Sequence, residues 1–355
     1  MRLRMPAPAA ALALAAVLAT APACDNPSAP RGAPAPTPTA TSPVPATGSY
    51  AGPVDVGGGR TLFLRCAGSG SPTVILESGL HDSSDTWTFT DTRPPVPKSP
   101  AVLPGVAAFT RVCTYDRPGT VRYAEPLALT TRSTPVKGTR SLSAMVADLD
   151  KLLTAARLPG PYLLVGHSVG GMITRLYAQQ HPGKTAGLVF VDSFGTDLRP
   201  LFGTEWPAYV HLLNHPGTPF DARPEFEVLD IDGAIDAVDD AQPLPVVPMA
   251  VLSKTEPFGA PPGAPKALLG TLERAWPTVQ RTLVGLGSQT PQYLATGSDH
   301  YVQVHDPDLT ISAIRLVVGR MPRPGTPPGQ GPGQGPGQGP GQGPGQGPGQ
   351  GPGSR

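Results

Sequence analysis

The fold is decided by residues 161–180, PYLLVGHSVGGMITRLYAQQ, in which an apolar run and a helical run meet at a serine. This order predicts a strand, a sharp turn and a helix, with Ser168 at the apex. Glycines flank the serine because the serine is strained and two backbones pass close together at such a turn. The strain lifts the hydroxyl clear of the sheet, and the first amides of the helix point to where an acyl oxyanion would form. Ser168 is therefore a candidate nucleophile.

Residues 1–23 have the features of an export signal: basic residues, an Ala/Leu-rich core and a small-residue cleavage site. The apolar core of about twelve residues is too short to span a bilayer, which takes ~20. Cleavage after Ala23 would leave Cys24 at the N-terminus, where bacterial lipoproteins carry a lipid anchor. Ala21 and Pro22 depart from the usual lipoprotein processing site, which leaves a secreted protein as the alternative. We prefer a lipoprotein anchored through Cys24, because Asp25 and a Pro/Ala/Thr/Ser-rich tether follow the cysteine. Residues 24–50 form a Pro/Ala/Thr-rich tether.

Composition limits the classes of function that remain. The formal net charge is +1 and charged residues are scattered, so a nucleic-acid partner is not expected. Residues 323–355 form a tail with a Gly-Pro-Gly-Gln repeat at 331–350. The period of four excludes collagen, and the composition predicts a disordered tail. Residues 51–322 are long enough for one large domain with a substantial core.

Apolar strands alternate with helical patterns inside this domain, which is typical of a mostly parallel sheet covered on both faces. Strands are predicted at 61–65, 73–76, 111–115, 162–165, 188–191, 248–252 and 292–295. Apolar spacing predicts a helix over 142–156, and Asp306 followed by Pro307 predicts the start of a last helix. Pro- and aromatic-bearing pieces at 194–245 indicate a cap inserted between two parts of the core, 51–193 and 246–322. The cap aromatics would line an apolar pocket or pack the cap onto the core.

The chain from residue 60 to about 318 resembles the α/β-hydrolase superfamily. The resemblance is carried by the serine elbow, by VILESGL at 74–80, YDRPG at 115–119, LVFVDS at 188–193 and GSDHY at 297–301. It implies an α/β fold with a mostly parallel sheet, helices on both faces and an inserted helical cap. Many relatives have His-Gly before the oxyanion turn, whereas this chain has Ser78-Gly79.

A serine hydroxyl needs a base at hydrogen-bond distance and a third group that fixes the tautomer of the base. His300 follows the last strand, where the family places its base, and gives the chain order nucleophile, acid, histidine. We expect His305, beside the helix cap, to be structural and His167, inside the elbow, to point away from Ser168. The other histidines lie before a helix stop, in the cap or beside the oxyanion turn: His181, His211, His215 and His81.

The family resemblance also implies the donors for an oxyanion, namely the backbone N–H groups of Val169 and Leu80. His81 flanks the oxyanion turn, so its side chain could either line the pocket or lie in a surface loop. We interpret Asp116-Arg117 as a loop-fixing ion pair that takes no part in catalysis.

The acid has two candidates. Asp192 follows the strand at 188–191, and Glu256 follows the strand at 248–252, where the family usually places its acid. Either carboxylate could equally cap a backbone turn. Asp192 is preferred because a short carboxylate on a rigid strand end is held more accurately.

The chain has three cysteines. If Cys24 is lipidated, Cys66 and Cys113 are left as an even pair. The family's strand order puts their strands side by side, which implies a disulfide between them.

These features predict an exported serine hydrolase that cleaves a small-molecule ester through an acyl-enzyme, without a metal or an organic cofactor. An aminopeptidase or perhydrolase of the same fold is an alternative. A catalytically silent binding module is another, against which the intact Ser168 and His300 count.

Overall fold

The computed structural model describes residues 43–91, 96–259 and 263–321, all of which belong to one compact unit. The expected export signal, Cys24, residues 24–42 of the tether and the repeat tail lie outside the described residues.

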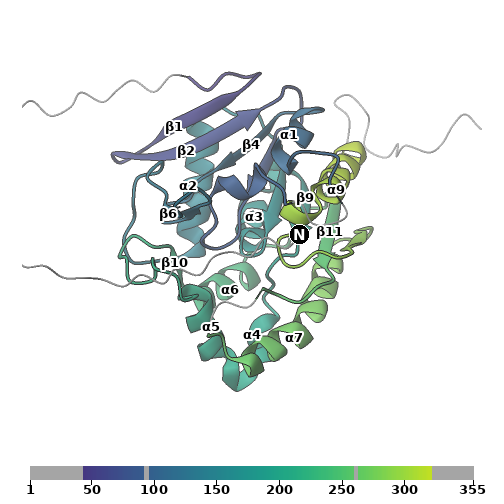
Figure 1. Ribbon diagram of the computed structural model, residues 1–355. Helices are drawn as coiled ribbons and strands as arrows, with labels where there is room; N and C mark the ends of the chain where they lie inside the picture. Colours follow the sequence, from purple (N-terminus) through teal and green to yellow (C-terminus); the bar gives the residue numbers. More distant parts are fainter. Residues whose placement is uncertain (1–42, 92–95, 260–262, 322–355) are drawn as a thin grey trace, which may run out of the picture. The chain divides into compact units, whose positions relative to one another are not determined.

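An eight-stranded sheet forms the centre of this unit (Figure 1), in the order β1-β2-β4-β3-β8-β9-β11-β12. β2 pairs antiparallel with β1 and with β4, and the other neighbours in this sheet pair parallel. The strands are β1 (Tyr50–Gly57), β2 (Arg60–Ala67), β3 (Val74–Glu77), β4 (Val112–Tyr115), β8 (Tyr162–His167), β9 (Thr185–Val191), β11 (Met249–Lys254) and β12 (Gln292–Ala295). The seven predicted strands are confirmed.

β1 was not predicted, although all of it except Tyr50 lies in the segment assigned to the core. Its sequence, YAGPVDVG, contains glycine and proline, and only Val54 and Val56 are buried. Such a strand is tolerated at a sheet edge, where one side of its backbone needs no partner.

Helices cover both faces of the sheet, because successive strand residues point to opposite sides. Leu164 of β8 packs in one apolar cluster with α2 (Leu142–Ala155) and α3 (Gly170–Gln180). Val165, the next residue, packs in a second cluster with α1 (Val102–Ala107) and α9 (Pro307–Arg320). Ser141 caps α2, and Asp306 caps α9 as predicted.

The segment expected to be a cap contains α4 (Leu198–Phe202), α5 (Trp206–Asn214), β10 (Val228–Leu229) and α6 (Ile231–Asp239). α4 packs against α7 (Lys266–Val284), a helix between β11 and β12 that was not predicted. Phe202, Trp206 and Tyr209 are buried against one another, with ring centroids 4.2–6.0 Å apart. Of the two roles considered for the cap aromatics, these three residues therefore serve packing.

The remaining elements are short. They are η1 (Ser84–Trp87), β5 (Val121–Arg122), β6 (Ala128–Leu129), β7 (Thr139–Arg140), η2 (Pro182–Lys184), η3 (Gly203–Glu205) and α8 (Val302–His305). β5 pairs with β6, and β7 pairs with β10 of the cap. No helix in the described ranges is long and apolar enough to cross a membrane.

Cys66 of β2 faces Cys113 of β4, and the two form a disulfide with their Cα atoms 4.1 Å apart. This is the pairing that the family's strand order implied. The bond joins the antiparallel edge of the sheet to its parallel part.

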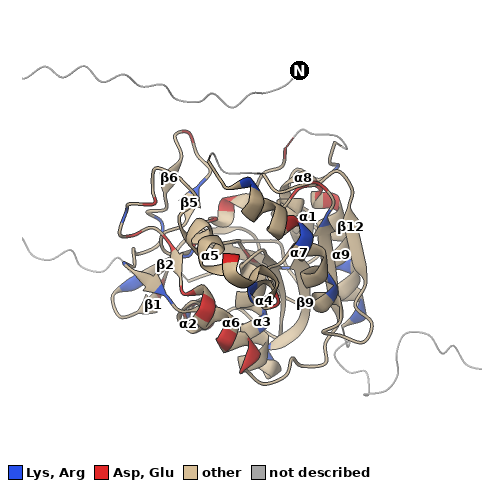
Figure 2. Ribbon diagram, turned by 90° about the horizontal axis from the view of Figure 1, so that it is seen from below, with Lys and Arg blue, Asp and Glu red and all other residues tan. Residues whose placement is uncertain are grey.

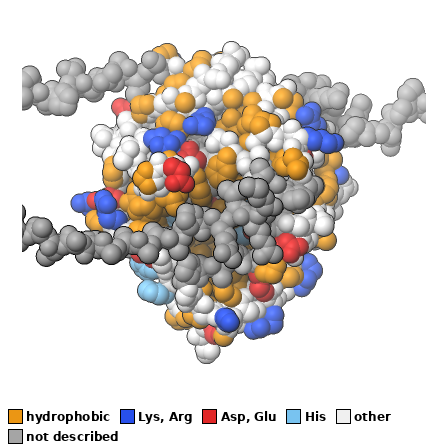
Figure 3. Space-filling model, viewed as in Figure 1, with side chains coloured by type: hydrophobic (Ala, Val, Ile, Leu, Met, Phe, Trp, Pro, Cys, Tyr) orange, Lys and Arg blue, Asp and Glu red, His pale blue; other side chains and the backbone are white. Residues whose placement is uncertain are grey.

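Charges are spread around the unit: acidic and basic residues intersperse over the sheet and its helices when it is seen from below (Figure 2). Hydrophobic, charged and polar side chains are likewise mixed on the face in Figure 3. The exposed large apolar side chains come from separate segments, and they include Val96, Leu127, Leu201, Val246 and Leu294.

Candidate active site

Ser168 stands at a strained turn between β8 and α3, with a φ of 52°. Its N–H donates to the Val191 carbonyl at 3.2 Å, and its carbonyl accepts from the N–H of Phe194 at 2.9 Å. A Cβ on Gly166 would lie 2.6 Å from the Gly170 carbonyl oxygen, so the turn requires glycine there. The predicted elbow is therefore present, and Ser168 is partly exposed at its apex.

His300 contacts the side chain of Asp192. His300 Nδ1 lies 2.7 Å from Asp192 Oδ2, and the Asp192 carboxylate is fully buried. The other oxygen, Oδ1, accepts from the backbone N–H of Lys254 at 3.0 Å and from Trp276 Nε1 at 2.8 Å. Asp192 itself has a φ of 41°, directly after β9. One oxygen is thus anchored by β11 and α7, and the other is free to meet the histidine.

Glu256, the alternative acid, is exposed after the end of β11. Its backbone N–H donates to the Ser298 carbonyl at 2.9 Å, and its carbonyl accepts from Lys254 Nζ. No hydrogen bond joins its carboxylate to His300 within the described residues. The structure brings Asp192, and not Glu256, to His300.

Aromatic rings surround His300. Its ring centroid lies 4.6 Å from that of His167, 4.8 Å from Phe258 and 5.5 Å from Trp276. Only 16% of the His300 side chain is exposed. The rings restrict the orientation of the imidazole and keep most water away from it.

The oxyanion turn follows β3. Within the described residues, neither the N–H of Leu80 nor that of Val169 donates to a protein acceptor. Both stay free for a ligand, which is what an oxyanion site requires. A Cβ on Gly170 would lie 2.5 Å from the Ser78 carbonyl oxygen, so the elbow and the turn are in close contact.

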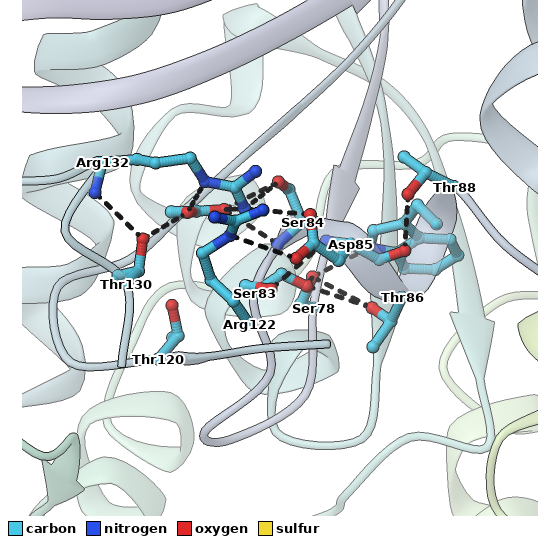
Figure 4. A network of polar contacts seen from close by, with 12 residues as sticks. Ser78, Ser83, Ser84, Asp85, Thr86, Thr88, Thr120, Arg122, Thr130 and Arg132 are labelled. Carbon is cyan, nitrogen blue, oxygen red and sulfur yellow. Dashed lines mark hydrogen bonds and ion pairs between the residues drawn. The ribbon is translucent and has the colours of Figure 1, made fainter. Parts of the chain in front are cut away.

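Ser78, which stands where many relatives have histidine, is buried in a polar network (Figure 4). Its Oγ donates to the Ser83 carbonyl at 3.1 Å and accepts from Trp87 Nε1 at 3.0 Å. Beside it, Ser84 donates to Asp116, which also accepts from Arg132. The network ties η1 back onto the turn and so fixes the backbone around Leu80.

Asp116 and Arg117 do not pair with each other, although both hold loops through ion pairs. Arg117 is buried between Glu77 of β3 and Glu227 of the cap segment, at 2.7 Å from each. Burial works against a charged Glu227, but Arg117 holds the pKa of that carboxyl below its usual value. Asp116 binds Arg132 instead, at 2.7 Å. The loop-fixing role holds, with different partners from those expected.

His167 was expected to point away from Ser168, and its ring lies against His300. The ring is buried, and Nε2 lies 2.9 Å from the backbone carbonyl oxygen of His300. On the other side, Nδ1 lies 3.8 Å from Asp82 Oδ2. Asp82 Oδ1 accepts from the hydroxyls of Tyr123 at 2.6 Å and Tyr301 at 3.3 Å.

Burial controls the protonation of this group. It raises the pKa of Asp82 to about 6 and lowers that of His167 well below its ordinary value, with the nearby His300 adding to the latter effect. Burial also raises the pKa of Tyr123 and Tyr301, where Asp82 adds to the rise. The two tyrosines therefore remain neutral donors to Asp82.

His81 is not a surface side chain. Its backbone has a φ of 67°, and its ring stacks on Phe226 of the cap segment at 4.2 Å. Burial lowers its pKa to about 4, so the ring is neutral at neutral pH. His305 contacts Asp91 and Asp299, which agrees with the structural role expected for it.

The remaining histidines contact other aromatic rings. His211 and His215 pair with each other at the end of α5, with ring centroids 5.0 Å apart. His181 lies against Tyr177 at 4.6 Å. No cluster of three or more His, Cys, Asp or Glu side chains suited to a metal ion occurs in the described ranges.

Sequence reasoning missed Trp276, Asp82, Tyr123 and Tyr301. These residues reach the site from four segments that are far apart in the chain. The one available signal was Tyr301, which directly follows His300 in the motif GSDHY.

A family model described as the alpha/beta hydrolase fold matches residues 72–219. The chain is 24% identical to an uncharacterized protein of Bacillus subtilis over 251 residues, covering 70% of this chain and 83% of that protein. It is 28% identical to a probable transporter of Hormonema carpetanum over 177 residues, 48% of this chain. The chain spans 22% of the length of that transporter and 15% of another curated relative. A solved serine hydrolase from a Cycloclasticus bacterium is similar at 18% identity and a TM-score of 0.49, covering 77% of this chain and 98% of that one.

Proposed function

Because this chain belongs to the α/β-hydrolase superfamily, we propose that it is a serine hydrolase that cleaves carboxylic esters through an acyl-enzyme on Ser168. In this proposal His300 is the base, Asp192 is the acid that orients it, and the N–H groups of Leu80 and Val169 bind the oxyanion.

The observation that carries the proposal is the contact between Asp192 and His300. Because Asp192 Oδ2 lies 2.7 Å from His300 Nδ1, that nitrogen carries the proton and Nε2 is left as the basic atom. The N–H of Lys254 and the indole of Trp276 fix Asp192 from its other oxygen. The imidazole thereby has one tautomer and one orientation.

The reaction then follows the general course of serine catalysis. Ser168 Oγ attacks the ester carbonyl while His300 Nε2 takes its proton, and the negative charge develops on the carbonyl oxygen. The C–O bond to the alcohol breaks, and the alcohol leaves with the proton from His300. Water next attacks the acyl group with His300 again as base, which releases the carboxylic acid and restores Ser168.

Paired variants test this assignment. Asp192→Asn keeps the shape of the side chain but favours the wrong histidine tautomer, which costs about 10⁴ in turnover in the serine-protease case. Glu256→Gln is the matched control and should cost tenfold or less. Hydrolysis of p-nitrophenyl esters of increasing chain length measures both and also defines the acyl preference.

Ser168→Ala should abolish turnover and covalent labelling by a fluorophosphonate while leaving the fold intact. Normal turnover by this variant would refute the nucleophile. If Glu256→Gln were crippled and Asp192→Asn normal, the acid would be Glu256. A wild-type protein that is never labelled would be a silent binding module.

A further inference from the structure

His167 connects the two halves of the proposed site. Its Nε2 lies 2.9 Å from the carbonyl oxygen of His300, on the loop that bears the base. Its Nδ1 faces the oxyanion turn, because a Cβ placed on Gly79 would lie 2.9 Å from His167 Nδ1 and 2.9 Å from Asp82 Oδ2. A glycine is therefore required at 79, directly over the gap between the two polar atoms.

The position of the proton on His167 follows from its neighbours. A backbone carbonyl only accepts, so Nε2 must carry the hydrogen that reaches the His300 carbonyl. Burial keeps the ring neutral. Nδ1 then carries a lone pair, and it has no hydrogen-bond partner among the described residues.

Asp82 is placed to supply the missing donor. Its Oδ1 is occupied by the hydroxyls of Tyr123 and Tyr301, which leaves Oδ2 facing Nδ1 at 3.8 Å. An ionised carboxylate would turn a lone pair toward another lone pair. A proton on Oδ2 replaces that repulsion with an O–H···N hydrogen bond and draws the two atoms together.

We propose that Asp82 and His167 are positioning residues for the proposed reaction: neutral Asp82 donates to His167 Nδ1, and His167 Nε2–H holds the main chain of His300. This inference rests on the proposed function, because it assumes that His300 is the base and that the turn after β3 binds the oxyanion. Its proton chain runs Asp82 Oδ2–H to His167 Nδ1, then His167 Nε2–H to the His300 carbonyl. No bond is made or broken in substrate by either residue.

Several charged and titratable groups surround Asp82 and His167. Tyr123 and Tyr301 donate to Asp82 and stay neutral, while the charges of Arg117 and His300 favour its ionised form. Asp299 adds a negative charge near His167. Burial outweighs the cations, so Asp82 keeps its proton to about pH 6. Above that pH the hold on His300 weakens.

Two substitutions of His167 separate positioning from packing. A glutamine places its amide nitrogen near the position of Nε2 and can still donate to the His300 carbonyl, whereas an asparagine reaches only the position of Nδ1. We expect His167→Asn to lower kcat for a p-nitrophenyl ester 10- to 100-fold with KM changed less than threefold. His167→Gln should recover at least tenfold of that loss. Equal kcat in both variants and the wild type would overturn the proposal.

Asp82→Asn tests the proton. Its amide can donate to His167 Nδ1 at every pH, and it keeps an acceptor for the two tyrosines. The ratio of kcat between Asp82→Asn and the wild type cancels the titration of the base itself, so it should rise at least threefold from pH 5 to pH 8. A ratio that is constant over this range would contradict a proton on Asp82.

A measurement on the wild type keeps the inference independent of variant folding and of turnover. ¹⁵N NMR of the imidazoles should show His167 neutral and protonated at Nε2. An Nδ1–H tautomer or an imidazolium at pH 5 would refute the pair. Failure of the proposed function would instead appear as a wild type that neither turns over esters nor reacts with a fluorophosphonate.

Discussion

Asp82 shows how burial sets the chemistry of a single residue. An aspartate titrates near 3.8 in the unfolded chain, and burial raises its pKa to about 6 in the fold. The folded protein therefore binds the proton more tightly than the unfolded chain does. The stability from neutral Asp82 is fully present below pH 3.8 and is lost as the pH rises through about 6, a loss of roughly 3 kcal/mol for two pKa units.

Asp82→Asn should accordingly stabilise the protein at pH 7.5, by up to about 3 kcal/mol, because the amide never ionises. The gain should shrink toward zero near pH 4. Urea unfolding at both pH values measures the difference, with the exposed Asp240→Asn as a matched control. A stabilisation that is the same at both pH values would show that ionisation of Asp82 is not its cause.

Residues of the site could be predicted where local sequence carries the signal. The elbow at Ser168 could be predicted because one of its glycines is required by close backbone contacts with residues that are near it in the sequence. Asp192 and Glu256 could be ranked only by rigidity, since their distance from His300 depends on how three strands align. The orientation of His167 depends on the loops of Asp82 and His300, which no local pattern connects.

At the scale of elements, the buried strands were readable because both of their faces are apolar. β1 was missed because an edge strand needs few buried residues. α7 was missed because Gly270 and Pro277 interrupt its pattern, although tertiary packing of its apolar face keeps it helical. That omission mattered for the site, because α7 carries Trp276, which anchors Asp192, and Gln280, which donates to the Ser193 carbonyl.

The disulfide joins two elements that are 47 residues apart in the chain. Replacing both Cys66 and Cys113 with alanine should lower the free energy of unfolding by roughly 4 kcal/mol, the loop-closure entropy of the chain-entropy model. Denaturant unfolding of the variant beside the oxidised wild type tests this. A loss below 1 kcal/mol would show that the paired strands constrain the loop without the covalent bond.

For the whole molecule, we propose export and attachment to the cell envelope through a lipid on Cys24. The sequence of residues 1–24 motivates the proposal, and the Cys66–Cys113 bond is compatible with an oxidising compartment. Cys24→Ser should move the protein from the membrane fraction to the soluble fraction, measured by fractionation and immunoblotting. Membrane retention of this variant would contradict lipidation, and a wild type found only in the medium would favour secretion.

The ion pair of Arg117 with Glu227 fixes part of the cap segment to the core. Glu227 belongs to the segment that returns from α5 to α6, and it is buried against a guanidinium that also binds β3. Lifting this segment would leave a buried cation without one of its two partners, at a cost of about 3 to 5 kcal/mol. The return segment is therefore held to the core at Arg117, whatever the rest of the cap segment does.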